Sequence, residues 1–314
     1  MDGLILVNKS QGITSHDVVV QIRNTLGIQK VGHYGTLDPL ATGLVVVAVG
    51  KTTRLFPFYS KKDKTYAGRM RLGFTTDTFD STGKPTSTEK KKLPQKAEVL
   101  KAMKKFVGEI EQIAPPYSAK KYKGKPLYEL VRRNEKFELR PSQVSIHFFD
   151  LVNFTPPELE FRVGCSSGTY IRSLAHDLGL RLGCGAHLSE LTRTAVGNFH
   201  KDDSLELDKI RQLNSEGHIE KFLIPLELLL PEFPKIILNE KGSILAKNGN
   251  KISSENIQKI FQDESIPQED FQEKEAIFRM FSLEGKFLAL AKKILEKDHF
   301  HPFLVIASSD DPTD

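Results

Sequence analysis

The sequence predicts a protein of the α+β class, with helices and strands mixed along a chain of 314 residues. Residues 44–49 form a continuous apolar, β-branched run, which is typical of a strand buried inside a sheet. Residues 64–73 alternate, with Tyr66 and Met70 on one face and arginines on the other, as expected of a half-buried strand. In residues 14–27, apolar side chains recur at helical spacing between a capping threonine and a closing glycine.

The remaining elements follow from the same two periodicities and from the turn-forming residues between them. We expect loops at Gly32–Gly43 and Thr75–Pro94. Further strands are predicted at Gly3–Asn8, Val144–Phe154 and Leu159–Cys165, and helices at Ala97–Val107, Leu127–Arg133, Tyr170–Leu182 and in two stretches before Pro231 and Pro234.

A domain boundary is predicted near Pro231–Lys235. We expect residues 1–232 to form the main domain, residues 233–306 a small β-rich unit, and residues 307–314 a disordered acidic tail. Short strands of the small unit are predicted at Lys235–Asn239, Ala276–Ser282 and Lys286–Ala291, and an irregular acidic stretch at Ile260–Glu275.

The net charge of +5 conceals an uneven distribution. Residues 1–140 hold 26 Lys and Arg against 13 Asp and Glu, a net charge of +13, whereas residues 141–314 hold 19 against 27, a net charge of −8. A basic half indicates a surface for a polyanion, with ordinary solvated lysines as the alternative.

Several classes of protein are excluded. No apolar stretch approaches the ~20 residues that span a bilayer, and the apolar run in residues 1–9 is too short for a signal peptide. Cys165 and Cys184 lack metal-ligand spacing and are expected to be reduced core thiols. We therefore expect a cytoplasmic protein without a disulfide.

Asp38 is the most informative single residue. It lies in a tight loop directly before a buried strand, and Pro39 disfavours helical geometry at Asp38, so its carboxylate is presented from an extended backbone. Gly35 and Gly43 permit unusual dihedral angles or the close approach of another backbone. From these residues alone, a structural turn and a reacting carboxylate both remain open.

Residues 32–43 meet every fixed position of the pattern G-H-x-G-T-L-D-P-x-A-x-G. They resemble the active-site motif of the tRNA uridine-55 pseudouridine synthases. Four other segments resemble elements of that family in the same order, and together they extend the resemblance from residue 3 to about residue 200. They are residues 8–15 (with Ser10 where proline is usual), 64–66, 167–174 and 191–199.

The resemblance implies a catalytic domain built on a central, mostly antiparallel sheet, followed by a PUA-like RNA-binding domain. It also implies a thumb-like RNA-binding segment at about residues 114–134, which is rich in lysine and tyrosine. The substrate would be the T stem-loop of tRNA, with no cofactor and no metal, and the protein would act as a monomer.

The family match also assigns roles to residues. Asp38 would be the catalytic carboxylate, and Arg172 would pair with it. A cation in the first turn of a helix opposes the helix dipole, so a nearby anion would help to explain Arg172. Substrate-binding residues would be Tyr66 (stacked on uracil), Arg172, Leu191, Lys9 and Tyr170, and RNA-binding residues His33, Lys120, Lys121, Lys123, Lys125 and Arg193.

Some alternatives stay open at this point. The carboxylate could attack the nucleotide covalently or remove a sugar proton. The protein could be a guide-dependent pseudouridine synthase of an RNA-protein particle, or a non-catalytic tRNA chaperone. A carboxylate-based glycosidase would need a second catalytic carboxylate and no RNA-clamping segment.

Overall fold

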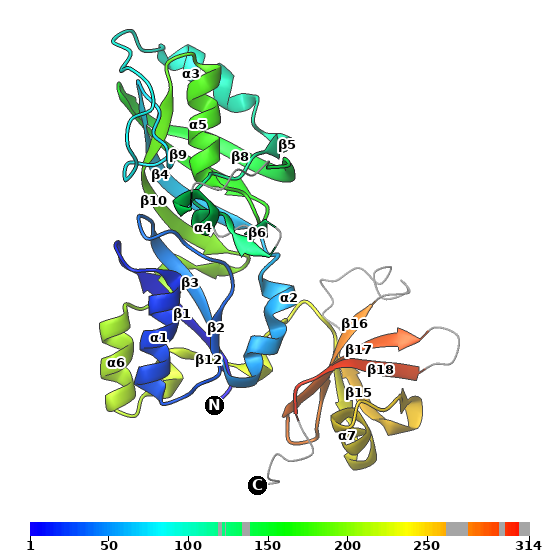
Figure 1. Cartoon of the computed structure of the whole chain (residues 1–314). Helices are drawn as coiled ribbons and strands as arrows, with labels where there is room; N and C mark the ends of the chain where they lie inside the picture. The colour runs from blue at the N-terminus through cyan, green and yellow to red at the C-terminus, as the bar shows by residue number, and fades with distance from the viewer. Residues whose placement is uncertain (119–120, 123, 134–138, 262–275, 295–298, 308–314) are drawn as a thin grey trace.

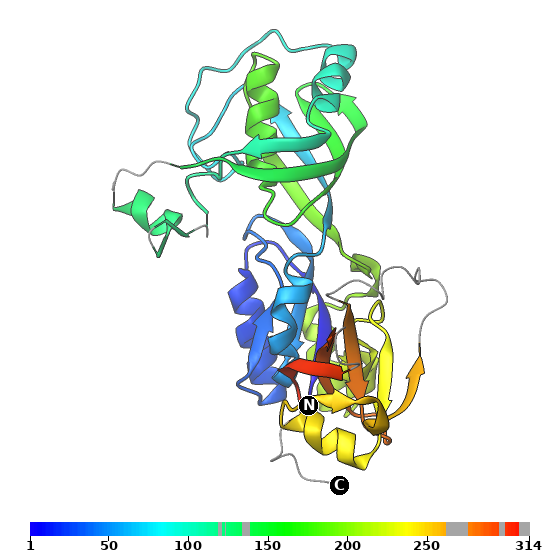
Figure 2. The ribbon, with the colours of Figure 1, turned by 90° about the vertical axis from the view of Figure 1, so that its right-hand side faces the viewer.

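A computed structural model describes residues 1–118, 121–122, 124–133, 139–261, 276–294 and 299–307. Two large sheets divide the molecule into two parts, which Figures 1 and 2 show from two sides. Strands of the larger sheet come from residues 3–225, and those of the smaller sheet from residues 235–305. The predicted α+β fold with a β-rich C-terminal region is confirmed.

The larger sheet has ten strands in the order β12-β1-β3-β10-β4-β9-β8-β5, with β11 beside β10 and β2 beside β3. Their bounds are β1 (Gly3–Lys9), β2 (Val31–His33), β3 (Thr42–Val49), β4 (Lys64–Leu72), β5 (Gly108–Gln112), β8 (Ser142–Thr155), β9 (Glu158–Cys165), β10 (Ala186–Val196), β11 (Phe199–His200) and β12 (Leu223–Pro225). All of these described pairs are antiparallel except β3 with β10, which confirms a mostly antiparallel sheet.

The helices of this part are α1 (Ser15–Leu26), α2 (Phe56–Tyr59), α3 (Lys96–Lys104), α4 (Leu127–Arg132), α5 (Ile171–Arg181) and α6 (Leu207–Ser215), with 3₁₀ turns at Gly50–Leu55, Lys201–Asp203, Ile219–Lys221 and Leu226–Leu228. Helices α1, α3, α5 and α6 of this part pack on the larger sheet (Figure 1). Helix α1 begins as predicted, because Thr14 and Asp17 form a reciprocal capping box, and it ends at Gly27 in the left-handed conformation.

The smaller sheet has six strands in the order β14-β18-β17-β16-β13-β15. Its elements are β13 (Lys235–Leu238), α7 (Glu240–Lys247), β14 (Ile252–Ser253), a 3₁₀ turn (Ser254–Asn256), β15 (Ile257–Phe261), β16 (Ile277–Phe281), β17 (Phe287–Ile294) and β18 (His299–Val305). The three strands predicted for this unit are confirmed. The prediction of irregular structure from Ile260 is wrong for its first two residues, which belong to β15; residues 262–275 and 308–314 lie outside the described part of the chain.

Two further features of the larger sheet differ from expectation. The predicted loop 32–43 begins inside β2 and ends inside β3, because residues 31–33 pair with β3. Strand β10, which runs through the middle of the larger sheet, was not predicted at all. The limits 1–232 and 233–306 stay a prediction, since one apolar cluster joins Leu44 of β3 to Phe281 and Leu290 of the smaller sheet.

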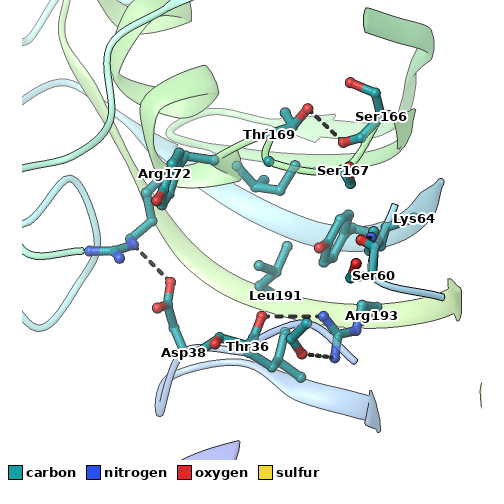
Figure 3. A pocket seen from close by; sticks show the side chains of 16 residues that line it. Thr36, Asp38, Ser60, Lys64, Ser166, Ser167, Thr169, Arg172, Leu191 and Arg193 are labelled. Atoms are coloured by element: carbon teal, nitrogen blue, oxygen red, sulfur yellow. Dashed lines mark hydrogen bonds and ion pairs between the residues drawn. The ribbon is translucent and has the colours of Figure 1, made fainter. Parts of the chain in front are cut away.

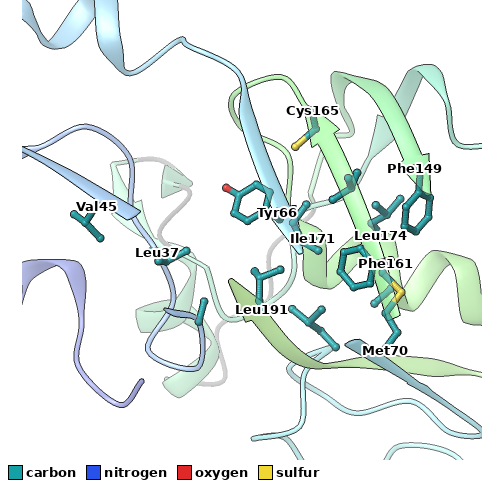
Figure 4. Close-up of a cluster of buried hydrophobic side chains, with 14 of the residues drawn as sticks. Leu37, Val45, Tyr66, Met70, Phe149, Phe161, Cys165, Ile171, Leu174 and Leu191 are labelled. Atoms are coloured by element: carbon teal, nitrogen blue, oxygen red, sulfur yellow. The ribbon is translucent and has the colours of Figure 1, made fainter. Parts of the chain in front are cut away.

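The main core extends from β1, β3 and α1 to β4, β9, β10 and α5, and Figure 4 shows part of it. Met70, Phe161 and Leu174 are fully buried there. Tyr66 and Leu191 belong to the same cluster and also line the cavity described below. The side chains expected to hold uracil are therefore fixed by core packing on one side.

Burial of Asp177 in α5 disfavours the charged form of its carboxyl group and raises its pKa from 3.8 to about 6. The folded protein therefore binds a proton at Asp177 more tightly than the unfolded chain does. As a result, the stability of the fold falls as pH rises from about 4 to about 6, where Asp177 has to ionise in its buried position. We expect Asp177→Asn to be more stable at pH 7 by about 1–3 kcal/mol.

Denaturant unfolding at pH 4 and pH 7 checks this prediction. The amide side chain of the variant does not titrate, so the variant should lose the part of the pH dependence that falls in that window. Asp150→Asn, at an exposed position in β8, serves as the control. If the unfolding free energy of Asp177→Asn differs between pH 4 and pH 7 as much as that of the unaltered protein, Asp177 is not the source of this pH dependence.

Candidate active site

A cavity of about 300 Å³ opens where the Asp38 loop, β4, β10 and the start of α5 meet (Figure 3). This volume is at the lower end of the range for small-ligand sites. The lining residues are Gly35, Thr36, Leu37, Asp38, Ser60, Lys64, Tyr66, Ser166, Ser167, Gly168, Thr169, Tyr170, Ile171, Arg172, Leu191 and Arg193.

The Asp38 loop is held through its backbone. The hydroxyl of Ser15, at the start of α1, accepts from the Leu37 amide at 2.8 Å and lies 3.2 Å from the Leu37 carbonyl oxygen. The Gly12 amide donates to the Pro39 carbonyl at 2.8 Å. None of these bonds uses the Asp38 carboxylate, which is 39% exposed and faces the cavity.

Arg172 forms an ion pair with Asp38, and its side chain is only 6% exposed. The Arg172 Nε lies 2.9 Å from Asp38 Oδ2, although the N–H does not point along a hydrogen bond of normal geometry. Arg172 Nη1 donates to the Thr78 carbonyl at 3.2 Å, and Nη2 donates to the Tyr117 carbonyl at 2.9 Å. The predicted pairing is thus present, and Arg172 lies in the first turn of α5 as expected.

Asp80 is a second anion on Arg172 that the sequence reasoning missed. Its Oδ2 lies 3.5 Å from Arg172 Nη1, and its Oδ1 accepts from the hydroxyls of Thr78 and Thr82 at 2.7 and 2.5 Å. Asp80 is buried and does not line the cavity, so it holds Arg172 from behind. The neighbouring Phe79 has φ = 64°, a strained angle for an aromatic residue. The sequence feature that could have indicated Asp80 is the polar segment D-T-F-D-S-T-G at residues 77–83.

Tyr66 and Leu191 come from neighbouring strands. Leu191 of β10 pairs with Gly68 of β4, two residues after Tyr66. Figure 4 shows both side chains at the edge of the core cluster, with the Tyr66 hydroxyl turned away from the packed side. Burial raises the pKa of Tyr66 above its ordinary value, so this group stays a neutral phenol at physiological pH. An aromatic ring and an aliphatic side chain thus face the same hollow as Asp38.

Comparison with known proteins identifies the family. Residues 23–171 match the TruB family pseudouridylate synthase (N terminal domain), and residues 172–231 match the tRNA pseudouridylate synthase B C-terminal domain. A tRNA pseudouridine synthase B of Clostridium tetani is 39% identical over 296 residues, 94% of this chain and 97% of that protein. One of Solibacter usitatus is 43% identical over 250 residues, 79% of this chain and 85% of that protein. This chain belongs to the TruB pseudouridylate synthase family.

Solved structures agree with a TruB-family fold along the chain. One chain from the structure of an H/ACA RNP bound to a substrate RNA containing 2'-deoxyuridine has a TM-score of 0.72 at 25% identity, covering 98% of this chain and 86% of that one. A chain of a Cbf5-Nop10-Gar1 complex gives the same TM-score and coverage at 27% identity. The protein is therefore an enzyme, a pseudouridine synthase.

Arg193, which was expected to contact RNA, lines the cavity. The side chain is 1% exposed. Its three nitrogens donate to backbone carbonyls, Nε to Leu44 at 2.7 Å, Nη1 to Thr36 at 3.3 Å and Nη2 to Gly35 at 3.1 Å. Arg193 thereby ties the Asp38 loop to β10.

The close contact between β3 and β10 depends on Gly43. This residue has φ = 98°, and a Cβ atom there would lie 2.4 Å from the Arg193 carbonyl oxygen. The sequence interpretation of Gly43 as a point of close backbone approach is confirmed. Because β3 follows the Asp38 loop directly, this approach fixes the loop against the strand that carries Leu191.

Lys9 was expected to bind substrate, and the structure does not place it in the cavity lining. Its side chain is completely buried, outside the cavity lining, and its ammonium donates to the carbonyls of Ser10 at 2.9 Å and Ile13 at 2.8 Å. Burial is the largest cause that lowers the pKa of Lys9 to about 8, and the charge of Asp38 partly opposes this. Lys9 shapes the turn before α1, from which Ser15 holds the Asp38 loop.

The structure describes some of the remaining expected site residues and not others. Tyr170 caps α5 and lines the cavity, whereas His33 lies in β2 outside the lining, and burial lowers the pKa of His33. Lys121 and Lys125 belong to a short hairpin, β6 (Lys121–Tyr122) with β7 (Lys125–Pro126). The other two expected thumb lysines, Lys120 and Lys123, lie outside the described residues.

The thumb segment meets the active site at its base. Gln112 exchanges two hydrogen bonds with the backbone of Tyr170, at 3.0 and 2.7 Å, and Tyr117 accepts from Arg172. Figure 2 shows α4 and the hairpin standing away from the larger sheet. Sequence reasoning did not identify Gln112, because a single buried amide carries no local signal.

Among the described residues, His, Cys, Asp and Glu side chains do not gather in groups of three that could hold a metal ion. The helices in this part of the chain all lack the length and apolar character needed to cross a membrane.

Proposed function

We propose that this synthase converts uridine-55 in the T-arm of tRNA to pseudouridine, with Asp38 as the catalytic carboxylate. The observation that carries the proposal is Asp38 itself, which is exposed in a base-sized cavity and paired with the buried Arg172. Relatives that cover nearly the whole chain carry the name tRNA pseudouridine synthase B, which supports tRNA as the substrate class.

The reaction is an isomerisation that needs no oxidant and no energy-rich cofactor. The N1–C1′ bond of uridine breaks, the uracil turns, and a C5–C1′ bond forms, with the C5 proton passing to solvent and N1 taking up a proton. Asp38 either forms a transient bond to the nucleotide, which breaks again before the product leaves, or removes a sugar proton that it later returns. In both routes the negative charge of Asp38 favours the developing positive charge at C1′. Arg172, held by Asp80 and two carbonyls, aims the carboxylate.

Uracil would occupy the cavity between Tyr66 and Leu191, with Tyr170 at its edge. A stacked base cannot reach Asp38, so the uridine must be flipped out of its loop, at a cost of a few kcal/mol. RNA contacts offset this cost. We assign them to His33 and to the thumb lysines Lys120, Lys121, Lys123 and Lys125, whose segment contacts Arg172 through the Tyr117 carbonyl.

We further propose that the enzyme acts in the cytoplasm as a monomer on the T stem-loop and without a guide RNA. Identity supports this choice over the guide-dependent alternative. The chain is 39% identical to the Clostridium tetani tRNA pseudouridine synthase B, but 25–27% identical to the chains of the H/ACA and Cbf5-Nop10-Gar1 structures.

Incubation of the purified protein with an unmodified tRNA transcript, followed by base-resolved pseudouridine mapping, tests the proposal. We expect one pseudouridine, at position 55, and none in a transcript that carries cytidine there. Because no guide RNA is present, the guide-dependent alternative predicts no product. Modification at other positions alone would defeat the assignment of uridine-55.

A further inference from the structure

A lysine-rich surface lies at the end of the catalytic part, outside the cavity and the thumb. Residues 84–105 hold eight lysines and only two glutamates. All eight lysines are exposed, and so is Arg181 at the end of α5. The surface comprises Lys84, Lys90, Lys91, Lys92, Lys96, Lys101, Lys104, Lys105 and Arg181.

The two glutamates of this segment do not neutralise its lysines. Glu89 pairs with Arg71 at 3.3 Å, and Glu98 accepts from the Gln95 amide at 2.7 Å in the capping box of α3. Among the described residues, none of the eight lysines has a carboxylate within ion-pair distance. With both glutamates counted, residues 84–105 carry a net charge of +6.

Folding alone does not explain this concentration of charge. Lys101 has Lys104 three residues and Lys105 four residues further on, and like charges at these spacings destabilise a helix. The dipole at a helix C-terminus favours a cation in the last turn, which accounts for Lys101 and Lys104 in α3 and for Arg181 in α5. It does not account for the lysines of the preceding loop.

The surface is also hollowed. A cavity of about 310 Å³ lies between α3 and the end of α5, lined by Lys101, Lys105 and Arg181 together with Pro94, Glu98, Ala102 and Leu182. The Arg181 guanidinium lies 5.2 Å from the centre of the Phe106 ring, a contact that helps to hold it in place beside the hollow. Cations from two helices thus converge on one recess.

The place of this surface separates it from the catalytic cavity. Helix α5 begins at the cavity with Arg172 and reaches Arg181 nine residues later, about 14 Å away at 1.5 Å per residue. Figure 1 shows α3 beside that far end of α5, with the thumb helix α4 nearer to the other end. RNA bound there is therefore not the flipped nucleotide.

We propose that the lysine-rich surface binds backbone phosphates of the tRNA outside its T stem-loop. The inference rests on the proposed function, because that function brings a folded polyanion to this enzyme. Lysines that neutralise phosphates release counterions, so the contact would raise affinity without reading sequence. It would also hold the tRNA body while the T-arm enters the cavity.

The test replaces Lys101, Lys104 and Lys105 with Gln, which preserves helix propensity and leaves the active site untouched. Affinity for an unmodified tRNA transcript is measured over a series of salt concentrations. We expect at least about tenfold weaker binding at low salt, and a slope of log affinity against log salt that is shallower by about 2–3. Turnover of an isolated T stem-loop should be unchanged.

The matched control replaces three exposed lysines far from this surface, Lys30, Lys209 and Lys221, with Gln. An equal loss of tRNA affinity in both triple variants would overturn the proposal. It would also be overturned if the Lys101, Lys104 and Lys105 variant lost as much affinity for the isolated T stem-loop as for the whole tRNA. Binding is measured independently of turnover. If the protein leaves position 55 unmodified but its tRNA affinity still depends on the three lysines, the proposed function is wrong. The proposal that the lysine-rich surface binds tRNA is then supported.

Discussion

Asp38→Asn is expected to abolish pseudouridine formation, with a rate lower by at least about 10³-fold. The amide neither attacks a sugar or base carbon nor accepts a sugar proton, yet it has the size of the carboxylate. The loop should keep its shape, because the Ser15 hydroxyl and the Gly12 amide hold its backbone without using the Asp38 side chain. Affinity for RNA should therefore be nearly unchanged.

Single-turnover assays on an unmodified tRNA transcript, with binding measured in parallel, separate these two expectations. Asp202→Asn, at an exposed position in a 3₁₀ turn, serves as the control for loss of one surface charge. Turnover of Asp38→Asn near the rate of the unaltered enzyme would remove Asp38 from the chemistry. Loss of RNA binding together with turnover would indicate a structural role instead.

The lining of the cavity also bears on the glycosidase alternative. Asp38 is the one carboxylate among the described lining residues, since Asp80 is buried behind Arg172. A glycosidase of the usual kind needs two carboxylates flanking the same bond. The site therefore favours a single-carboxylate reaction on a flipped base.

The parts of the fold that were predicted correctly have strong local signals. Strand β3 is a continuous apolar run, β4 alternates, and α1 has a capping residue at each end. Strand β10 was missed because polar residues interrupt its apolar pattern. Two register shifts, between Leu188 and Glu190 and between Arg193 and Ala195, break the two-residue period along it.

The site residues divide in the same way. Asp38 and Arg172 were identified from a motif and from a cation in an unfavourable helix position, and their ion pair is present. The backbone carbonyls around Lys9 and Arg193 were not predicted, because the sequence does not distinguish a cation that faces RNA from one that such carbonyls surround inside the protein. Asp80 lies 42 residues from Asp38 in the chain, and only the folded structure shows that both meet Arg172.

Arg172→Met is expected to lower kcat about 10²–10³-fold, because the guanidinium orients the Asp38 carboxylate, the proposed catalytic group, from a fixed position. Four groups from three segments hold that position: Asp38, Asp80 and the carbonyls of Thr78 and Tyr117. Arg172→Lys should restore little activity, since a single ammonium cannot reach all four acceptors in the geometry of the planar guanidinium. Single-turnover rates at saturating RNA measure the effect.

Loss of stability has to be separated from loss of orientation. Arg172→Met leaves Asp80 buried without its cation, which should cost about 3–5 kcal/mol of unfolding free energy. Adding Asp80→Asn removes that uncompensated charge, so the double variant should regain stability in denaturant unfolding but not turnover. Recovery of turnover together with stability would show that Arg172 acts only by holding the fold. Continued inactivity of a stable double variant would show that the guanidinium is needed beside Asp38 itself.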